Sequence, residues 1–576
     1  MNSLFAGLLW LVPVWPLLLA LGLTLPAIRK FGIALLPWAL LPALLVWVLA
    51  GSAQLGWIAL DWQQALYAPD VLMGTRITLD SLSFIWLSLA LLVWGVASLH
   101  SKWVKDNQAW RFALFFLLSM SGSLGLSLAA DAISFYLMFS LMSLAAWGLV
   151  VHDQTEFAKR AGFWYLLLAV LAELVLFAGV VARAAELGTT DLAVWASQSS
   201  AEWGLGLIWL GLAVKVGVPL LHIWLPLAHP AAPVSASAVL SGVMIKAGII
   251  GWWVMLPSLV MQDSVFVSFM PWLGVTTMLL AAVLGLMQTD PKAVLAYSSI
   301  SQMGWLIWGL GWVWQGAEPD ALVIWVAWFA LHHALIKGAL FLGVGWIKVT
   351  ATESRIVPWI WVGLILLGLL LAGMPWSAGA WLKAQMKLAS LEAGLVMPYA
   401  LLVMGSVATA LLMIHFLRRL AKLDSVSREQ AKPINRLALL SWFGLVALAA
   451  GWIYWVASPV WNAEGLFDAL KPLVIAIVLA MAWRIRIHKQ LICPAGDLVV
   501  WFEVLGRKVS IWQRVYQAWW QRMMQRSSKG SSRFYDAYRQ LLARASSTEG
   551  RLLNWPVFMQ SLGLVVLVFV GLLVFG

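Results

Sequence analysis

The feature that most constrains this chain is a succession of long apolar runs separated by short polar breaks. Of its 576 residues, 62% are hydrophobic and 11% are charged. A typical soluble domain is about 25% charged. A soluble protein of this size has no interior large enough to bury so much apolar surface. The sequence therefore predicts an all-α polytopic membrane protein.

The apolar runs predict about sixteen membrane spans, because each run is long enough, or nearly so, to cross a bilayer. The first run has no basic segment before it and no small-residue cleavage site, so we expect a retained span and not a signal peptide. The predicted spans are 5–28, 31–50, 79–99, 111–130, 132–151, 161–182, 204–221, 234–257, 268–288, 296–314, 321–347, 357–390, 396–417, 437–457, 470–483 and 556–575.

The basic residues predict the orientation of these spans. When the connections between spans are assigned alternately to two sides, 29 of the 37 lysines and arginines fall on the odd-numbered side and three on the other. By the positive-inside rule, the odd-numbered side is cytoplasmic and both termini lie outside. We expect a multi-pass protein of a bacterial-type cytoplasmic (inner) membrane. The net charge of +12 thus needs no nucleic-acid partner.

Several classes of site lack the residues they require. The single cysteine, Cys493, excludes an iron–sulfur cluster, a cysteine-based zinc site and an internal disulfide. The chain has no phosphate-binding GxxxxGK[ST] loop and no GxGxxG after a strand pattern. The spacing of the eight histidines matches no zinc motif. We therefore expect no metal and no cofactor in this chain.

Five lysines remain inside predicted spans, where each buried charge costs roughly 2.5–3.5 kcal/mol on insertion scales. A glutamate, Glu173, is the one acid deep in a span. Lysines kept in hydrocarbon at this cost indicate an ion or proton pathway. For Lys387, near the end of its span, snorkelling to the interface is an equal alternative. The five are Lys215, Lys246, Lys337, Lys383 and Lys387.

Two of the predicted spans are interrupted beside a lysine. Pro219 follows Lys215 and Gly217, and Pro375 lies between Gly373 and Lys383. Proline removes a backbone donor, and irregular backbone at membrane depth persists only where protein or water satisfies it. The breaks lie five spans apart, which predicts two inverted repeats of the kind that mark ion pathways. An ordinary proline kink is the structural alternative.

At these residues the sequence resembles the antiporter-like membrane subunits of respiratory complex I, Mrp-type cation/proton antiporters and membrane-bound hydrogenases. The matching segments follow the family's order over roughly residues 79–420. They are Leu79–Ser83, Lys215 to Leu-His222-Ile-Trp-Leu-Pro226, Pro233 to Gly248, Asp290-Pro-Lys to Ser298 and Gly304, His332-His333-Ala-Leu-Ile-Lys337 to Gly343, and Gly373-Met-Pro375.

The resemblance implies a fourteen-helix core with two proton half-channels joined by a polar axis. It implies proton-transfer roles for Lys215, for Lys246, for Lys337, His332 or His333, and for Lys383. We add His222, in the matching segment after the first break, to these candidates. The other histidines near span ends, His229 among them, are expected to be solvated or to cap helices.

One position departs from the family pattern. The family carries a glutamate on its fifth helix that pairs with the seventh-helix lysine, and Ser140 stands there in this chain. A neutral serine cannot compensate the charge of Lys215. On antiparallel helices joined near Glu156, Ser140 and Glu173 lie at nearly the same depth. We therefore hypothesise that Glu173 replaces the missing acid, the alternatives being another polar partner or lost coupling.

The predicted organisation has five parts. Residues 498–526 alternate aromatic and basic positions, which predicts an interfacial amphipathic helix, and a basic segment continues to residue 551. Anchoring by anionic lipid and docking of a partner are equally compatible with this segment. The parts are spans 1–3 in 1–110, the two repeats in 111–257 and 268–420, spans 14–15 in 421–490, and the basic segment with the final span in 491–576.

The leading interpretation is a proton- or cation-translocating subunit that works with other membrane subunits and moves H⁺, with Na⁺ or K⁺ as further candidates. It is more a transporter subunit than an enzyme. One alternative is a proton channel that energises a soluble partner enzyme, as in inorganic-carbon accumulation systems. The other is a scaffold that has lost transport together with the acid at position 140.

Overall fold

The computed structural model describes residues 2–71, 74–103, 108–198, 202–256, 265–316, 319–392, 399–423, 431–456 and 463–486. The chain divides into two compact units, one of Met1–Leu66 and Arg76–Asp497 and one of Tyr67–Thr75 and Leu498–Gly576. In the second unit, the described residues form a turn in which the Thr75 hydroxyl donates to the Val71 carbonyl (3.1 Å). The predicted segment 498–551 and the span 556–575 lie outside the described residues. Apart from the ends of the strands β1 and β2, all that follows concerns the first unit.

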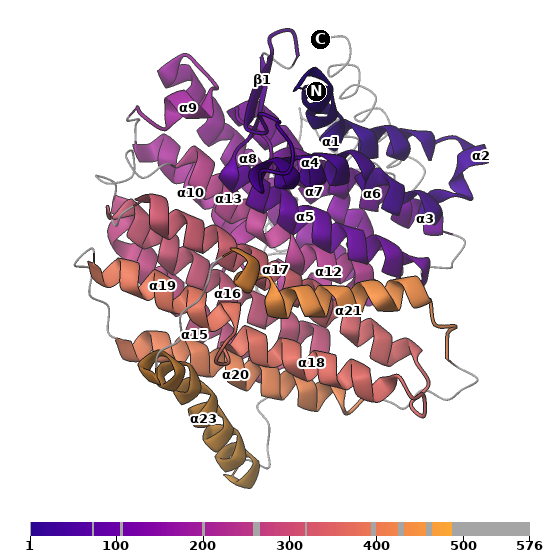
Figure 1. The fold of residues 1–576 in the computed structure, drawn as a ribbon, viewed down its shortest axis with the longest axis vertical. Helices are drawn as coiled ribbons and strands as arrows, with labels where there is room; N and C mark the ends of the chain where they lie inside the picture. The colour runs from indigo at the N-terminus through magenta and orange to yellow at the C-terminus, as the bar shows by residue number, and fades with distance from the viewer. Residues whose placement is uncertain are drawn as a thin grey trace, which may run out of the picture. The chain divides into compact units, whose positions relative to one another are not determined.

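Helices dominate the described residues (Figure 1), and every predicted span except 556–575 is helical over most of its length. Eleven of these helices are long and apolar enough to cross a membrane. The chain is therefore an all-α polytopic membrane protein, with one two-stranded sheet among its described residues.

The elements follow the order of the chain. The N-terminal elements are α1 (Asn2–Gly22), α2 (Pro26–Arg29), α3 (Gly32–Leu35), η1 (Pro37–Leu40), α4 (Leu41–Gln54), β1 (Gln64–Ala68), β2 (Thr75–Leu79), α5 (Ser81–His100) and η2 (Ser101–Trp103). The central elements are α6 (Ala109–Leu126), α7 (Ala132–Val150), α8 (Glu156–Leu187), α9 (Leu192–Trp195), α10 (Glu202–Val216), α11 (Trp224–Ala231), α12 (Val234–Gly242), η3 (Met244–Lys246) and α13 (Ala247–Met255). The C-terminal elements are α15 (Val265–Leu286), α16 (Pro291–Trp314), α17 (Pro319–Val349), α18 (Val357–Ala372), α19 (Ala378–Glu392), α20 (Tyr399–Leu420), α21 (Arg436–Gly451), α22 (Ile453–Val456) and α23 (Ala463–Arg486).

Polar side chains fix where several spans begin. Asp80 caps α5 through a reciprocal pair of bonds with Ser83, Asp290 accepts from two amides at the start of α16, and Asn435 caps α21. These oxygens satisfy amide groups that have no partner inside the helix. The apolar runs thus start at caps that the sequence itself supplies.

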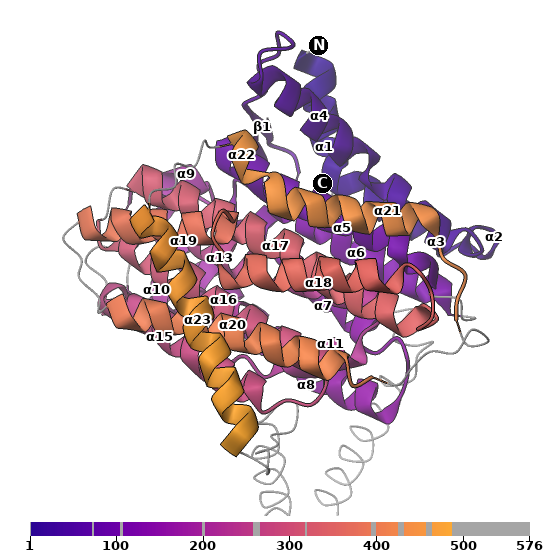
Figure 2. The same cartoon turned by 60° about the horizontal axis from the view of Figure 1, so that its bottom comes forward.

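Glycines allow the helices at the centre to approach closely. A Cβ atom on Gly274 of α15 would lie 2.6 Å from the carbonyl oxygen of Gly304 on α16. The two backbones therefore touch where side chains would separate them, as is common for helices in membranes. Helices α12, α16 and α17 form the buried centre between the two breaks, and α18, α20 and α21 pack beside them (Figures 1 and 2).

The two predicted breaks have the same backbone construction. Gly217 and Gly373 have φ values of +79° and +88°, and the residues three positions later, Leu220 and Trp376, also have positive φ (+74° and +61°). Each glycine amide donates to the carbonyls three and four residues back, and the next amide donates to the carbonyl five residues back. This helix ending needs the left-handed conformation that glycine supplies.

A third irregularity was not predicted. The sequence predicts one span over 234–257 and no break in it. In the structure, the 3₁₀ segment η3 separates α12 from α13 and ends at Lys246. Three buried lysines, Lys215, Lys246 and Lys383, thus lie in spans that depart from α-helical backbone. A short 3₁₀ segment inside a helix commonly marks a functional position.

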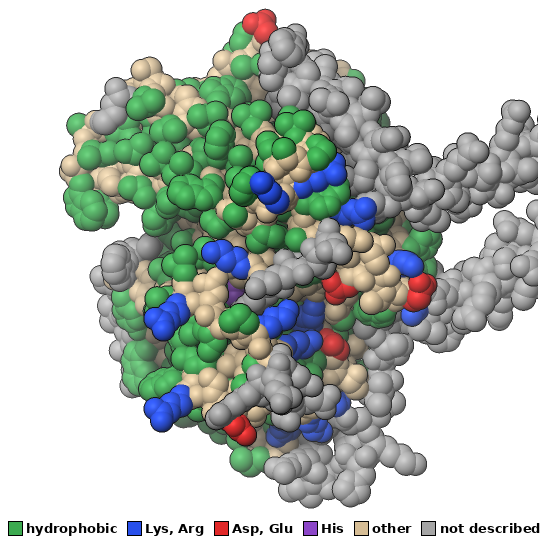
Figure 3. Space-filling view, turned by 90° about the vertical axis from the view of Figure 1, so that its right-hand side faces the viewer, with side chains coloured by type: hydrophobic (Ala, Val, Ile, Leu, Met, Phe, Trp, Pro, Cys, Tyr) green, Lys and Arg blue, Asp and Glu red, His purple; other side chains and the backbone are tan. Residues whose placement is uncertain are grey.

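Basic side chains gather on one face of the described residues. Figure 3 looks onto this face, where blue lysine and arginine side chains are more frequent than red acidic ones. Exposed basic residues lie at the helix ends that the alternation of spans assigns to the odd-numbered side, among them Lys30, Lys159, Arg160, Arg418, Lys422 and Arg436.

Candidate functional site

The first polar group inside the bilayer surrounds Lys215, in the last turn of α10. Its Nζ atom donates to the hydroxyl oxygens of Ser143 (3.1 Å) and Tyr165 (3.4 Å). The amine also lies 5.1 Å from the centre of the Trp224 ring. Because the break ends α10 directly after Lys215, the free carbonyls and the negative end of the helix dipole favour an ammonium there.

Glu173 of α8 lies in the same group. Its electrostatic neighbours are Lys215, Ser143 and Ser140. Among the described side chains, no direct ion pair within 4.0 Å joins Glu173 to Lys215, and the Oε1 atom of Glu173 has no hydrogen-bond partner. A small cavity of about 10 Å³ adjoins Lys215 and is also lined by Ser143, Tyr165 and Ala172, the residue before Glu173. This is the space that one water needs to link polar groups.

The second group is built on the three central helices. Lys246 is fully buried and donates from Nζ to the carbonyl oxygen of Ser241 (2.6 Å). Lys337 of α17 is also fully buried and donates to the Leu295 carbonyl (2.8 Å) and to the Ser298 hydroxyl. Lys246 and Lys337 interact electrostatically. Carbonyl and hydroxyl acceptors offset the cost of the buried amines without supplying a countercharge.

His332 and His333 connect this group to the second break. His333 interacts electrostatically with Lys246, Lys337 and Lys383, and His332 with Lys383. Both ring nitrogens of His333 are buried without a hydrogen-bond partner among the described residues, and His332 lies beside the backbone of Leu370. A Cβ atom on Gly379 of α19 would lie 2.8 Å from His332 Nε2, so this glycine leaves room for the ring.

Lys383 lies on α19, after the second break, and differs from Lys215. Its side chain is 8% exposed, and no hydrogen-bond partner of its Nζ atom is found among the described residues. The nearest aromatic contact is Trp305, whose ring centre is 4.9 Å from Nζ. The first break therefore encloses its lysine among polar groups, and the second leaves its lysine beside an open cavity.

Two polar side chains are buried that the sequence did not predict to be buried. His229, expected at a solvated end, is fully buried and stacks on Phe341 with ring centres 4.3 Å apart. Lys292, assigned to a connection, is 4% exposed and donates to the Ala232 carbonyl (2.6 Å). The expectation was wrong because neighbouring helices, which no local pattern reveals, cover these span ends. Lys292 lies within a matched family segment, and His229 lies between two of them.

The remaining candidates occupy edges of these groups. His222 is 3% exposed and lies edge-on to Tyr297, with ring centres 5.9 Å apart. Pro219 and Pro375 lie inside the two breaks. Lys387 is 29% exposed at its side chain and lies 4.0 Å from Asp468 of α23, so it belongs to the mouth of the second break.

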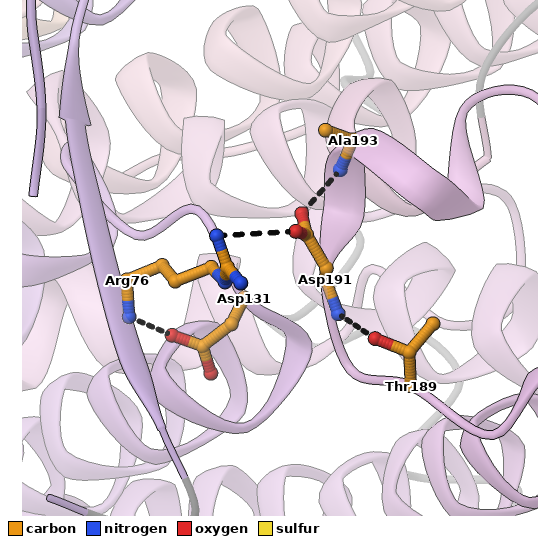
Figure 4. A network of polar contacts seen from close by, with 5 residues as sticks. All are labelled: Arg76, Asp131, Thr189, Asp191 and Ala193. Carbon is orange, nitrogen blue, oxygen red and sulfur yellow. Dashed lines mark hydrogen bonds and ion pairs between the residues drawn. The ribbon is translucent and has the colours of Figure 1, made fainter. Parts of the chain in front are cut away.

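A polar network fixes the start of α7, the helix that carries Ser140 and Ser143. Asp131 accepts from the Arg76 amide (2.7 Å) and from the Ser134 amide (2.7 Å). The Arg76 guanidinium reaches Asp191 (3.3 Å), which caps α9 by accepting from Ala193. Figure 4 shows these side chains joining the strand β2 to the starts of both helices.

The arrangement of these side chains suits proton transfer more than the transfer of a chemical group between substrates. Buried lysines and histidines gain and lose protons, and hydroxyls and water carry protons between them. The described residues contain no cluster of three or more histidine, cysteine, aspartate or glutamate side chains that would hold a metal ion. The fold and the site define a polytopic membrane protein with titratable groups along its buried centre.

Comparison with known proteins gives the family. Residues 129–412 match the family model described as "NADH:quinone oxidoreductase/Mrp antiporter, TM". The chain belongs to this family of antiporter-like membrane subunits. It is 31% identical over 325 residues to hydrogenase-4 component B of Escherichia coli K12, covering 52% of this chain and 46% of that protein. It is 28% identical to a putative antiporter subunit of Staphylococcus epidermidis (60% and 47% covered).

Solved structures show the same fold. The Mrp complex from Dietzia sp. DQ12-45-1b contains a chain with a TM-score of 0.60 and 20% identity, covering 83% of this chain and 96% of that one. A chain of an archaeal membrane-bound sulfane sulfur reductase has a TM-score of 0.65 and 21% identity, covering 82% and 99%. The matched regions span about half the length of the first curated relatives.

Proposed function

We propose that this chain is a proton-translocating subunit of a multi-subunit membrane complex, of the Mrp antiporter or complex I type. The names of the relatives indicate the class of complex, and the buried lysine amines are groups that can accept and release protons. The observation that carries the proposal is the burial of Lys246, Lys337 and His333 in the apolar centre, where His333 interacts electrostatically with both lysines and with Lys383. Charged groups retained inside a membrane protein at such cost mark ion pathways.

In the proposed relay, a proton passes between Glu173 and Lys215 at the first break and between Lys246, Lys337, His333 or His332, and Lys383 at the second. His222 follows the first break in the chain and packs edge-on against Tyr297 of α16, so in the relay it extends the first group toward α16. A charge gained at one amine disfavours a charge on the next, so each transfer drives release from its neighbour. Other membrane subunits complete the pathway.

We infer that the two similarly built breaks belong to inverted repeats in 111–257 and 268–420 within a fourteen-helix core. The matching conformations of Gly217 and Gly373 support this inference. The face rich in lysine and arginine is assigned to the cytoplasm, in a bacterial-type inner membrane, with both termini outside. The segment 498–551 is assigned to anionic lipid or to a partner subunit. H⁺ is the transported ion, and Na⁺ or K⁺ would be exchanged for it.

A scaffold without transport is the second candidate, and Ser140 is the observation that favours it. The position of Glu173 beside Ser140, Ser143 and Lys215 weighs against it, because an acid is still present in the group.

Lys246→Ala tests the proposal. The full complex is reconstituted in vesicles, and proton movement is followed with a pH-sensitive dye. We expect proton flux to fall by about 100-fold, the size of effect typical of a lost proton-transfer group. The control is Lys159→Gln, which removes an exposed lysine paired with Glu156. Unchanged flux in a correctly assembled Lys246→Ala complex would refute the relay.

A further inference from the structure

A cavity of about 360 Å³ lies beside the second break. It is lined by α16, α18, α19, α20 and α23, and its polar lining includes Lys383, Lys387, Ser406 and Asp468. Cavities of roughly 300–1,000 Å³ are the usual size of small-molecule sites. The corresponding space at Lys215 is about 10 Å³. The second break thus has room for a ligand that the first break lacks.

The buried amine of Lys383 faces this cavity without a partner. Its Nζ atom has no hydrogen-bond acceptor among the described residues, although the side chain is only 8% exposed. A Cβ atom on Gly373, which also lines the cavity, would lie 3.8 Å from Nζ. Burying an ammonium without a countercharge or acceptors is costly, so the arrangement calls for an acceptor inside the cavity.

The charges around the cavity favour an anion. Lys383 and Lys387 both line it, and Asp468 is the one acid among the described residues of its lining. Asp468 lies closer to Lys471 (2.9 Å) than to Lys387 (4.0 Å), so its charge is shared. The N-terminus of α19, whose residue Ala380 also lines the cavity, adds a partial positive charge. A metal cation would be repelled here.

We propose that this cavity binds a small singly charged anion, held by the ammonium of Lys383 with Lys387 at the mouth. The ring of Trp305 forms an apolar wall 4.9 Å from the amine, which limits the number of waters that compete for it. The same chemistry fits free chloride or the phosphodiester headgroup of an anionic lipid, because α23 is exposed along most of its described length. Anion binding does not depend on proton translocation.

The test measures binding to the purified complex, with no proton gradient. Radioactive chloride is titrated onto the complex in phosphatidylcholine nanodiscs, and retained phosphatidylglycerol is measured by native mass spectrometry after preparation from mixed lipid. We expect saturable chloride binding that Lys383→Gln weakens by at least about tenfold, the effect of losing one charge-assisted hydrogen bond. Lys383→Arg retains binding, and Lys159→Gln serves as the matched surface control.

The two sources of the anion give different results. Chloride binding that depends on Lys383 assigns the cavity to a free anion, and phosphatidylglycerol retention that depends on Lys383 assigns it to a lipid headgroup. If the Lys383→Gln complex does not assemble, the Lys387→Gln variant is used instead, and we expect it to bind the anion several-fold more weakly than the wild type. The proposal is overturned if the wild-type complex binds neither probe, or if the decisive lysine variant binds both as well as wild type. Neither result bears on the proton flux of Lys246→Ala.

Discussion

Gly217 and Gly373, which lie in different membrane spans, end their helices in the same left-handed conformation with the same set of backbone hydrogen bonds. Each is followed by a proline two residues later. The lysines differ in placement, because Lys215 precedes the first break and Lys383 follows the second. One lysine therefore lies at the C-terminus of a half-helix and the other near the N-terminus of one, where the helix dipoles have opposite signs.

The left-handed glycines give the first prediction. Gly217→Ala and Gly373→Ala each cost about 1–2 kcal/mol, because alanine at positive φ is strained. Gly188, at the end of α8, also has positive φ (+67°), and a Cβ atom there meets nothing within 4 Å. Gly188→Ala should destabilise the complex as much as the two break variants do, so all three should lower its thermal unfolding temperature to a similar extent. Proton flux should fall only in the two break variants, and equal flux in all three would show that the breaks have no functional role.

The acid at the first break gives the second prediction. Glu173→Gln should reduce proton flux at least about tenfold, which corresponds to ~1.4 kcal/mol of lost stabilisation of a protonated lysine. Adding Ser140→Glu to this variant should restore much of the flux, because the two positions face the same group. Glu186→Gln, an exposed position on the same helix, is the control. Failure of the double variant to recover any flux, despite normal assembly, would contradict the replacement of one acid by the other.

The paired histidines give the third prediction. His333 interacts with three buried lysines, and His332 with Lys383 alone among them. His333→Phe should therefore reduce flux by about 100-fold, and His332→Phe by less. Phenylalanine keeps the ring volume, so the comparison separates proton transfer from packing. A larger loss in His332→Phe would assign the relay to the other histidine.

Asp131, outside the membrane spans, gives the fourth prediction. Burial raises the pKa of its carboxyl above the usual 3.8, although the amides of Arg76 and Ser134 counter part of this rise. The folded protein then holds the proton more tightly than the unfolded chain. The carboxyl therefore favours the fold at low pH, and this contribution is lost as pH rises from 3.8 through the folded-state pKa.

Asp131→Asn removes this titration and keeps an acceptor for the Ser134 amide. Unfolding temperatures of both proteins are compared from about pH 4 to about pH 7. The wild type should lose stability relative to the variant as pH rises across this window. A difference that stays constant with pH would show that Asp131 does not titrate in this range.

The membrane class and the position of most spans follow from the sequence. Long apolar runs have one physical solution in lipid, a helix that satisfies its own backbone. The two breaks were also predictable, because Gly217, Pro219, Gly373 and Pro375 restrict the backbone locally. The 3₁₀ segment before Lys246 was not, since no proline or glycine within Met244–Lys246 marks it.

The sequence identified four of the buried lysines, Lys215, Lys246, Lys337 and Lys383, because a lysine in an apolar run is visible without coordinates. Only the tertiary structure decided which groups meet: Glu173 faces the polar group of Lys215, His333 lies among three lysines, and Lys383 borders a cavity. It also showed that helix packing buries His229 and Lys292. The physical reason is that apolar periodicity fixes how a helix crosses the membrane, whereas the partners of a polar side chain depend on helix rotation, depth and close glycine contacts between segments distant in the chain.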